Sequence, residues 1–130
     1  MEFQNNALFW QKIDTLFFSS QIVINRQKKS AHPQYPNLIY PVDYGYLKDI
    51  ETADKSRINV FVGSLGKKNH SIEYLVIAAD ILNKDIEIKI LHNCSEKEIR
   101  EILIFLNQTD FQKTILLKKG KDIPSWAETQ

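Results

Sequence analysis

The stretch DIEIKILHNCSEKEIREILIFLNQ, residues 85–108, carries the clearest structural signals in this chain. Over residues 85–91 isoleucine alternates with aspartate, glutamate and lysine, which predicts a strand with one apolar face and one ionic face. A helix is predicted over 95–108, because Ser95 at the N-cap and Glu98 three residues later match a capping box. The apolar stripe of this helix is formed by Ile99, Ile102, Leu103 and Leu106.

The segments around this stretch add a second helix and several short strands. An apolar stripe at Phe9, Ile13, Leu16 and Phe17 predicts a helix over 5–18. The run EYLVIAAD, residues 73–80, lacks alternation, which is typical of a central strand buried on both faces. Further β-rich runs lie at 21–25 and 57–64, with a final strand at 113–118. This order predicts one α+β domain over 1–130: a barrel or curled sheet over about 21–92, N-terminal and C-terminal flanking helices, and a tail over 120–130.

Composition and charge limit the classes of function. The chain is 43% hydrophobic and 25% charged, which is ordinary for a globular protein. Lys and Arg total 17 against 16 Asp and Glu, so no overall basic field favours nucleic acid. One cysteine, Cys94, excludes an intrachain disulfide. The first 20 residues do not match a signal peptide, and no apolar run has transmembrane length. We therefore expect a cytoplasmic protein with no membrane partner.

A second informative stretch is YPVDYGYL, residues 40–47, which contains three tyrosines. Their even spacing suits one face of a strand, but Pro41 and Gly45 argue against an uninterrupted central strand. Taken alone, the three rings fit amphipathic core aromatics whose hydroxyls reach water or a polar partner. They also fit a polar site that uses phenolic hydroxyls.

The segments IVINRQKKSAHPQYPNLIYPVDYGYL (22–47) and TADKSRINVFVGS (52–64) together resemble the soluble family I inorganic pyrophosphatases, in particular a short pyrophosphatase-like branch. The resemblance extends from about Ile22 to Lys89. It implies a five-stranded barrel of OB-like type, Mg²⁺ ions, and hydrolysis of pyrophosphate or a related phosphoanhydride to phosphate by metal-activated water.

The resemblance also implies roles for individual residues. Tyr40 and Tyr44 would lie beside the phosphate cavity and act in catalysis together with Asp54, and Gly45 would let the chain turn tightly there. The implied substrate-binding residues are Arg26, Lys28, Tyr40, Tyr44 and Lys89, and the implied metal ligands are Asp54, Asp85 and Glu87.

Two positions depart from the pattern of the family. In its three-aspartate segment only Asp54 remains, because Ser56 and Asn59 stand where the other two carboxylates are expected. Magnesium prefers several oxygen ligands, so this loss weakens the predicted metal site. The charged residues of 85–89 also fit the solvent-exposed face of a sheet.

Three functions follow as alternatives. The first is a Mg²⁺-dependent pyrophosphatase-like hydrolase, weakened by the two replaced aspartates. The second is a non-catalytic module that binds phosphate or nucleotide. The third is an OB-like surface for single-stranded nucleic acid, which the near-zero net charge argues against. The aromatic N-terminal helix, with Phe9, Trp10, Phe17 and Phe18, further predicts a homo-oligomer formed through that helix.

Overall fold

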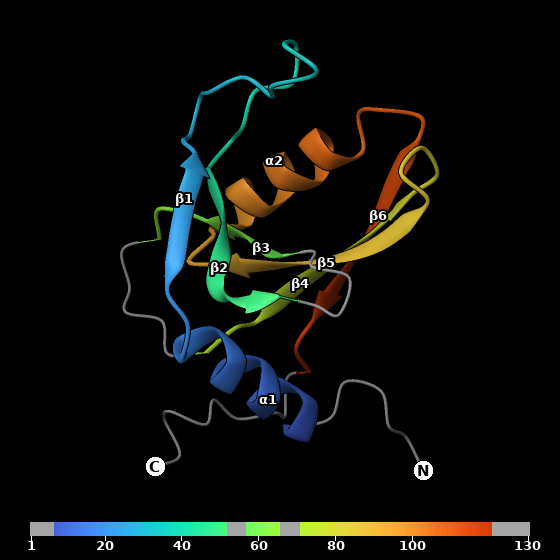
Figure 1. Cartoon of the computed structure of the whole chain (residues 1–130). Coiled ribbons are helices and arrows are strands. Elements are labelled where there is room, and N and C mark those ends of the chain that lie inside the picture. The colour runs from blue at the N-terminus through green and yellow to red at the C-terminus, as the bar shows by residue number, and fades with distance from the viewer. Residues whose placement is uncertain (1–6, 52–56, 66–70, 121–130) are drawn as a thin grey trace.

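The computed structural model describes residues 7–51, 57–65 and 71–120, and it has a mixed α+β fold (Figure 1). The elements in chain order are α1 (Ala7–Phe18), β1 (Ile22–Arg26), β2 (Asp43–Glu51), β3 (Arg57–Val62), β4 (Tyr74–Asp80), β5 (Asp85–His92), α2 (Glu96–Leu106) and β6 (Gln112–Lys118). The predicted α+β class with an N-terminal and a C-terminal helix is confirmed.

The strands form one sheet in the order β1-β2-β3-β5-β4-β6. All neighbours are antiparallel except β3 and β5, which are parallel. The expected count of five strands is corrected to six, because β6 pairs with β4 along its whole length, from Gln112 opposite Asp80 to Lys118 opposite Tyr74. Among the described strands β1 and β6 are the edges, so the sheet is curled and open rather than closed into a barrel.

The two helices cover opposite faces of this sheet (Figure 1). Val60, Leu75 and Ile90 belong to a buried cluster with Trp10 and Phe17 of α1. The next residue of each strand points to the opposite face of the sheet. There Phe61, Val76 and Leu91 form a second buried cluster with Ile102 and Phe105 of α2. The continuous apolar run of β4 is therefore explained, because its two faces lie under different helices.

In β5, burial does not follow the division into an apolar and an ionic face that the alternating pattern predicts. Ile90 is buried, but Ile86 and Ile88 are 74% and 49% exposed. On the ionic face, Lys89 is only 5% exposed. The reason lies in the positions of the helices: α1 covers the sheet at Ile90, and the β4–β5 hairpin extends beyond it (Figure 1).

The predicted capping box of α2 is present. The Ser95 hydroxyl accepts a hydrogen bond from the Glu98 backbone N–H at 3.2 Å, and the Ser95 N–H donates to Glu98 Oε1 at 2.9 Å. Glu98 also accepts hydrogen bonds from the backbone N–H and hydroxyl of Ser64. The start of α2 is thus fixed to the segment that follows β3.

In α1 the aromatic side chains are divided between core and surface. Trp10 and Phe17 are buried, while Phe9 and Phe18 are exposed. Association of copies through this helix stays a prediction. Within the described ranges, no helix has both the length and the apolar character needed to cross a membrane.

Candidate functional site

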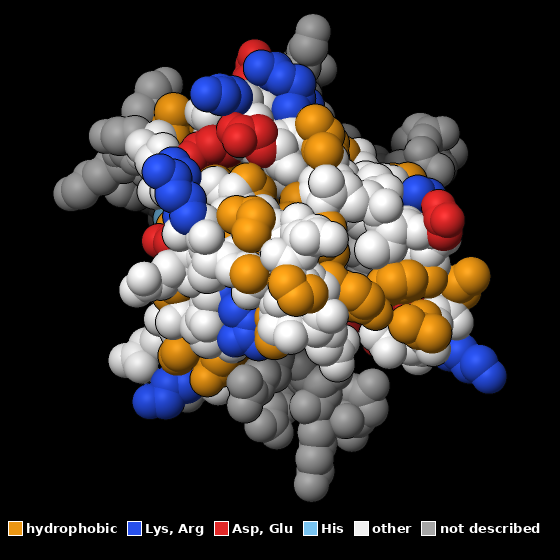
Figure 2. Space-filling view, turned by 90° about the horizontal axis from the view of Figure 1, so that it is seen from above, with side chains coloured by type: hydrophobic (Ala, Val, Ile, Leu, Met, Phe, Trp, Pro, Cys, Tyr) orange, Lys and Arg blue, Asp and Glu red, His pale blue; other side chains and the backbone are white. Residues whose placement is uncertain are grey.

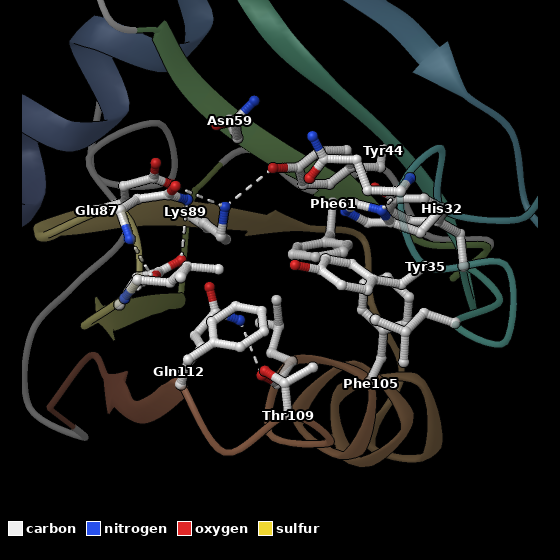
Figure 3. Close-up of a pocket in the computed structure, with 18 residues that line it drawn as sticks. His32, Tyr35, Tyr44, Asn59, Phe61, Glu87, Lys89, Phe105, Thr109 and Gln112 are labelled. Carbon is white, nitrogen blue, oxygen red and sulfur yellow. Dashed lines mark hydrogen bonds and ion pairs between the residues drawn. The ribbon is translucent and has the colours of Figure 1, made fainter.

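A pocket of about 280 Å³ lies between the sheet and α2 (Figure 3). β2, β3 and β5 supply Tyr44, Phe61 and Lys89, and α2 supplies Phe105. The loop between β1 and β2 closes one side with residues that include Tyr35. The pocket forms here because β3 and β5 are adjacent parallel strands whose α2-facing side chains are held under the helix.

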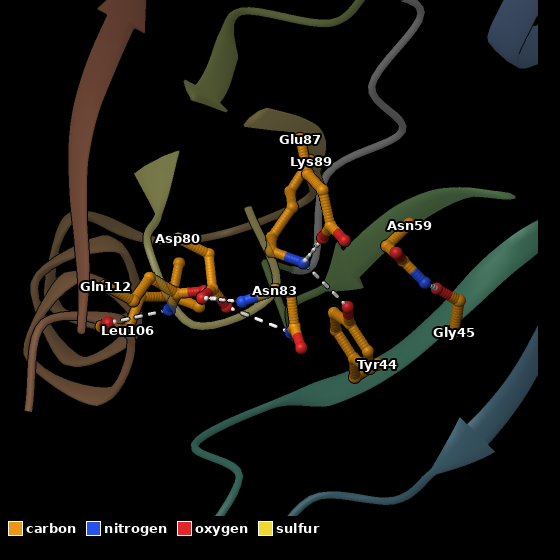
Figure 4. A network of polar contacts seen from close by, with 9 residues as sticks. All are labelled: Tyr44, Gly45, Asn59, Asp80, Asn83, Glu87, Lys89, Leu106 and Gln112. Atoms are coloured by element: carbon orange, nitrogen blue, oxygen red, sulfur yellow. Dashed lines mark hydrogen bonds and ion pairs between the residues drawn. The ribbon is translucent and has the colours of Figure 1, made fainter. Parts of the chain in front are cut away.

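Lys89 is the buried cation of this pocket. Its Nζ donates hydrogen bonds to Tyr44 Oη at 2.9 Å and to Glu87 Oε2 at 3.1 Å (Figure 4). Burial acts to lower the pKa of Lys89, but the neighbouring Tyr44 and Glu87 outweigh it and raise that pKa above its usual value. The side chain is therefore an ammonium with three N–H donors, of which two are used within the described part of the chain.

Tyr40 and Tyr44 form an aromatic stack beside this ammonium. The rings of Tyr40 and Tyr44 are stacked with centroids 5.2 Å apart, and Tyr44 also contacts Phe61 at 4.6 Å. Tyr40 packs against Phe105 at 4.7 Å. Burial, with a smaller effect from Tyr44, raises the pKa of Tyr40, so its hydroxyl stays protonated at neutral pH. The two alternatives for these rings are therefore combined: they are packed aromatics, and Tyr44 presents its hydroxyl to the pocket.

Three carboxylates gather where β4 turns into β5. Asp80 stands opposite Asp85 across the two strands, and Glu87 lies two residues further along β5. The oxygens of Asp80 accept hydrogen bonds from the backbone of Leu82 and Asn83 and from the Asn83 amide, at 2.9 to 3.1 Å, so this side chain closes the turn (Figure 4). Although Asp85 is exposed, some loss of hydration together with the charges of Glu87 and Asp80 raises its pKa.

These carboxylates do not form the oxygen cage that Mg²⁺ prefers. Within the described ranges no three metal-ligating side chains converge. The oxygens of Asp80 are engaged in the turn, and Glu87 is paired with the ammonium of Lys89. Asp54 and Ser56, from the predicted metal segment, lie outside the described residues. Asn59 is at the pocket and donates to the Gly45 carbonyl at 3.2 Å.

Several residues predicted for the site lie elsewhere. Lys28 is exposed and borders a second hollow with Lys29 between the β1–β2 loop and α2, while its backbone N–H donates to Asp43. Arg26 does not line the pocket, but it lies near enough to Tyr40 to oppose the increase in that pKa. Asp85 borders a hollow at the β4–β5 turn. Of the predicted substrate-binding set, Lys89, Tyr44 and Tyr40 are brought together.

Gly45 has a different role from the expected turn. It lies within β2, and a Cβ atom added there would overlap the carbonyl of Val23 in β1. The pairing of β1 and β2 shifts register between Ile24 and Arg26, and the two backbones approach closely at this point, so only a residue without a side chain fits.

Four residues of the pocket were not predicted from the sequence: Tyr35, Phe105, Phe111 and Gln112. The rings of Tyr35 and Phe111 contact each other with centroids 5.7 Å apart, although 76 positions separate them in the sequence numbering. One usable signal was available, because Tyr35 stands between Pro33 and Pro36 in an otherwise polar loop.

Several solved structures are similar to this chain, and two of them are described here. An inorganic phosphatase from Anaplasma phagocytophilum has a TM-score of 0.49 and 11% identity, covering 75% of this chain and 81% of its own. An inorganic pyrophosphatase from Helicobacter pylori has a TM-score of 0.49 and 12% identity, covering 78% and 84%. No family model matches the chain, and neither does any curated protein. Likeness at this level assigns no function, and membership of family I stays a prediction.

Proposed function

We propose that the pocket binds a phosphate-bearing small molecule, with the ammonium of Lys89 as its anchor. The observation that carries the proposal is that this buried cation keeps one N–H donor without a partner in the described part of the chain. A buried charge requires an opposite charge or hydrogen-bond acceptors, and a phosphate oxygen supplies both.

Tyr44 completes the anion site. Its hydroxyl oxygen accepts from Lys89, so its own hydrogen is available to donate. A phosphate oxygen placed between the third N–H of Lys89 and the hydroxyl of Tyr44 would receive two hydrogen bonds from these residues. Glu87 is the present counter-ion, and because its side chain is 43% exposed it can be displaced by the ligand.

This arrangement needs no metal ion to hold the anion. Calorimetry with pyrophosphate and with inorganic phosphate, each in EDTA and in Mg²⁺, tests the proposal. We expect binding that persists in EDTA and weakens at least about tenfold in Lys89→Met, since a hydrogen bond to a charged group contributes about 1.5–3 kcal/mol. Lys118→Met is the matched control, because Lys118 lies 5.9 Å from the ring of Tyr74 in a similar lysine–tyrosine contact away from the pocket.

Lys89 is buried, so folding of its variant must be verified by circular dichroism and urea unfolding. Tyr44→Phe is the second variant, since it keeps the ring and removes only the hydroxyl. Absence of binding to either anion by the wild-type protein, or wild-type affinity in both variants, contradicts the proposal.

Hydrolysis of pyrophosphate is a second candidate. It is favoured by the position of Asp85, which lies opposite Asp80 and two residues from Glu87. Loss of hydration, together with the charges of Glu87 and Asp80, raises the pKa of Asp85, and a bound cation would offset that repulsion. Phosphate release from pyrophosphate and from nucleotides, measured with Mg²⁺, Mn²⁺ or Zn²⁺, tests this candidate. Asp85→Asn and Asp54→Ala should abolish activity and Asp110→Asn should preserve it. If no metal supports release, the hydrolase candidate is rejected and the binding proposal remains.

A basic surface for nucleic acid has less support. On the face seen in Figure 2, Lys and Arg side chains stand in separate groups, some of them beside acidic side chains, and do not form a continuous field. A nucleic-acid strand needs repeated phosphate contacts along such a field. A small ligand needs only the local anchor described above.

A further inference from the structure

The pocket has two chemically different ends (Figure 3). Glu87 and Lys89 lie at one end, while His32, Tyr35 and Phe105 lie at the other. Tyr44 connects them: its hydroxyl bonds to Lys89, and its ring stacks on Tyr40 at the aromatic end. An inorganic anion would use only the first end.

We propose that the ligand is a nucleoside phosphate whose base lies against the aromatic end while its phosphate binds Lys89. This inference rests on the proposed phosphate anchor and adds the identity of the group attached to it. The volume of about 280 Å³ is near the lower limit, about 300 Å³, of pockets that hold organic ligands. An aromatic wall with a few placed polar groups is the usual composition of such pockets.

The aromatic end is preorganised for a planar group. Tyr35 stands between Pro33 and Pro36, which restrict the backbone on both sides. The loop is closed by hydrogen bonds from the Leu38 N–H to the Tyr35 carbonyl at 2.9 Å and from the His32 N–H to the Leu38 carbonyl at 2.8 Å. Because the ring of Tyr35 is already held in place, binding a base against it loses less conformational entropy.

The charge at this end also suits a neutral base. Nδ1 of His32 accepts a hydrogen bond from the Gln34 N–H at 3.1 Å, so the neutral ring carries its proton on Nε2. Burial, together with Arg26, lowers the pKa of His32 and favours this neutral form. The stacked, neutral imidazole therefore offers its Nε2–H as a donor to the base.

Uncharged amides are available for the polar edge of a base. Gln112 lines the pocket, and its Nε2 donates to the Leu106 carbonyl at 2.8 Å, which fixes the amide. Asn83 is fixed in the same way by Asp80 at 3.1 Å. Among the described residues, each amide keeps a carbonyl oxygen and a second hydrogen, which suit the mixed donors and acceptors of a base edge.

Calorimetry with AMP, ribose 5-phosphate, adenosine and pyrophosphate tests the inference. Stacking of one base on aromatic side chains contributes about 1–3 kcal/mol, so AMP should bind about tenfold more tightly than ribose 5-phosphate. Tyr35→Ala should remove this difference and leave the affinity for ribose 5-phosphate unchanged. Phe111→Leu is a second variant of the aromatic end, and Phe18→Leu, on the exposed surface of α1, is the matched control.

The outcomes separate the two proposals. Equal affinity for AMP and ribose 5-phosphate in the wild-type protein overturns the nucleoside inference and leaves the phosphate anchor intact. Equal affinity for AMP and adenosine overturns both, because the phosphate would then contribute nothing. A Tyr35→Ala variant that is folded and still prefers AMP by tenfold also overturns the inference.

Discussion

Removing the negative charge of Glu87 should strengthen anion binding. In Glu87→Gln the side chain keeps its size, but the ammonium of Lys89 loses the carboxylate that lies 3.1 Å from it. An entering phosphate would then meet an unneutralised cation and would not have to displace a bound counter-ion. If Glu87 were instead a metal ligand needed for binding, Glu87→Gln would lower the affinity. An increase in affinity therefore distinguishes a counter-ion of Lys89 from a metal ligand.

The size of the effect follows from the geometry. Two unit charges 3.1 Å apart attract by about 5 kcal/mol at an effective dielectric constant of 20, and by about 1.3 kcal/mol in water. Because the Glu87 side chain is 43% exposed, solvent screening moves the value towards the lower limit. A gain of about 1–2 kcal/mol corresponds to affinity for pyrophosphate about 5-fold to 30-fold higher.

Calorimetry in EDTA at low ionic strength measures this change, and added salt should reduce it. Glu96→Gln is the control, since it removes the same charge from an exposed position in the first turn of α2, outside the pocket. An affinity that is unchanged or lower in Glu87→Gln, with the control behaving as wild type, would refute the assignment of Lys89 as the anion anchor.

Three further measurements test the packing around the site. Gly45→Ala should lower the free energy of unfolding by about 1–3 kcal/mol, since its Cβ would overlap the Val23 carbonyl; an unchanged urea midpoint contradicts this. Burial raises the pKa of Cys94 to about 12, so a thiol reagent at pH 8 should react much more slowly with the folded than with the urea-unfolded chain. Burial acts to raise the pKa of Glu98, but hydrogen bonds from Ser95 and Ser64 lower it overall below its usual 4.5. The ionised carboxylate of Glu98 therefore stabilises the fold fully above about pH 4.5, and this contribution is lost as the pH falls through the lowered pKa. The free energy of unfolding should consequently decrease less steeply with acidification in Glu98→Gln than in the wild-type protein.

The sequence predicted well where the signal is local. The capping box of α2 depends on Ser95 and Glu98, three residues apart, and both of its hydrogen bonds are present. The buried central strand was also predicted correctly, because the apolar run of residues 73–80 has the length of a strand and is too short for a typical helix. The position of β6 in the sheet was not predicted, since nothing in residues 112–118 indicates that this strand pairs with β4 and not with another strand.

The candidate site was predicted in part, through resemblance and not through periodicity. Lys89 and Tyr44 were named as neighbours of a phosphate, and a hydrogen bond joins them. The alternation of β5 by itself equally favoured a solvent-exposed position for Lys89. Tyr35 and Phe111, from segments far apart in the chain, were not predicted because their contact depends on how the β1–β2 loop meets the start of β6.

Although Pro41 and Gly45 argued against a central strand where β2 lies, the amino-acid pattern indicated the other strands and helices and the residue at which α2 begins. Those properties depend on residues within a few positions of one another, whose spacing sets side-chain direction and satisfies the first backbone donors of the helix. The burial of Lys89 and the exposure of Ile86 and Ile88 follow from the packing of the helices and not from the local pattern. Both faces of β5 are defined by the same alternation, and their burial depends on where α1 and α2 pack against the sheet.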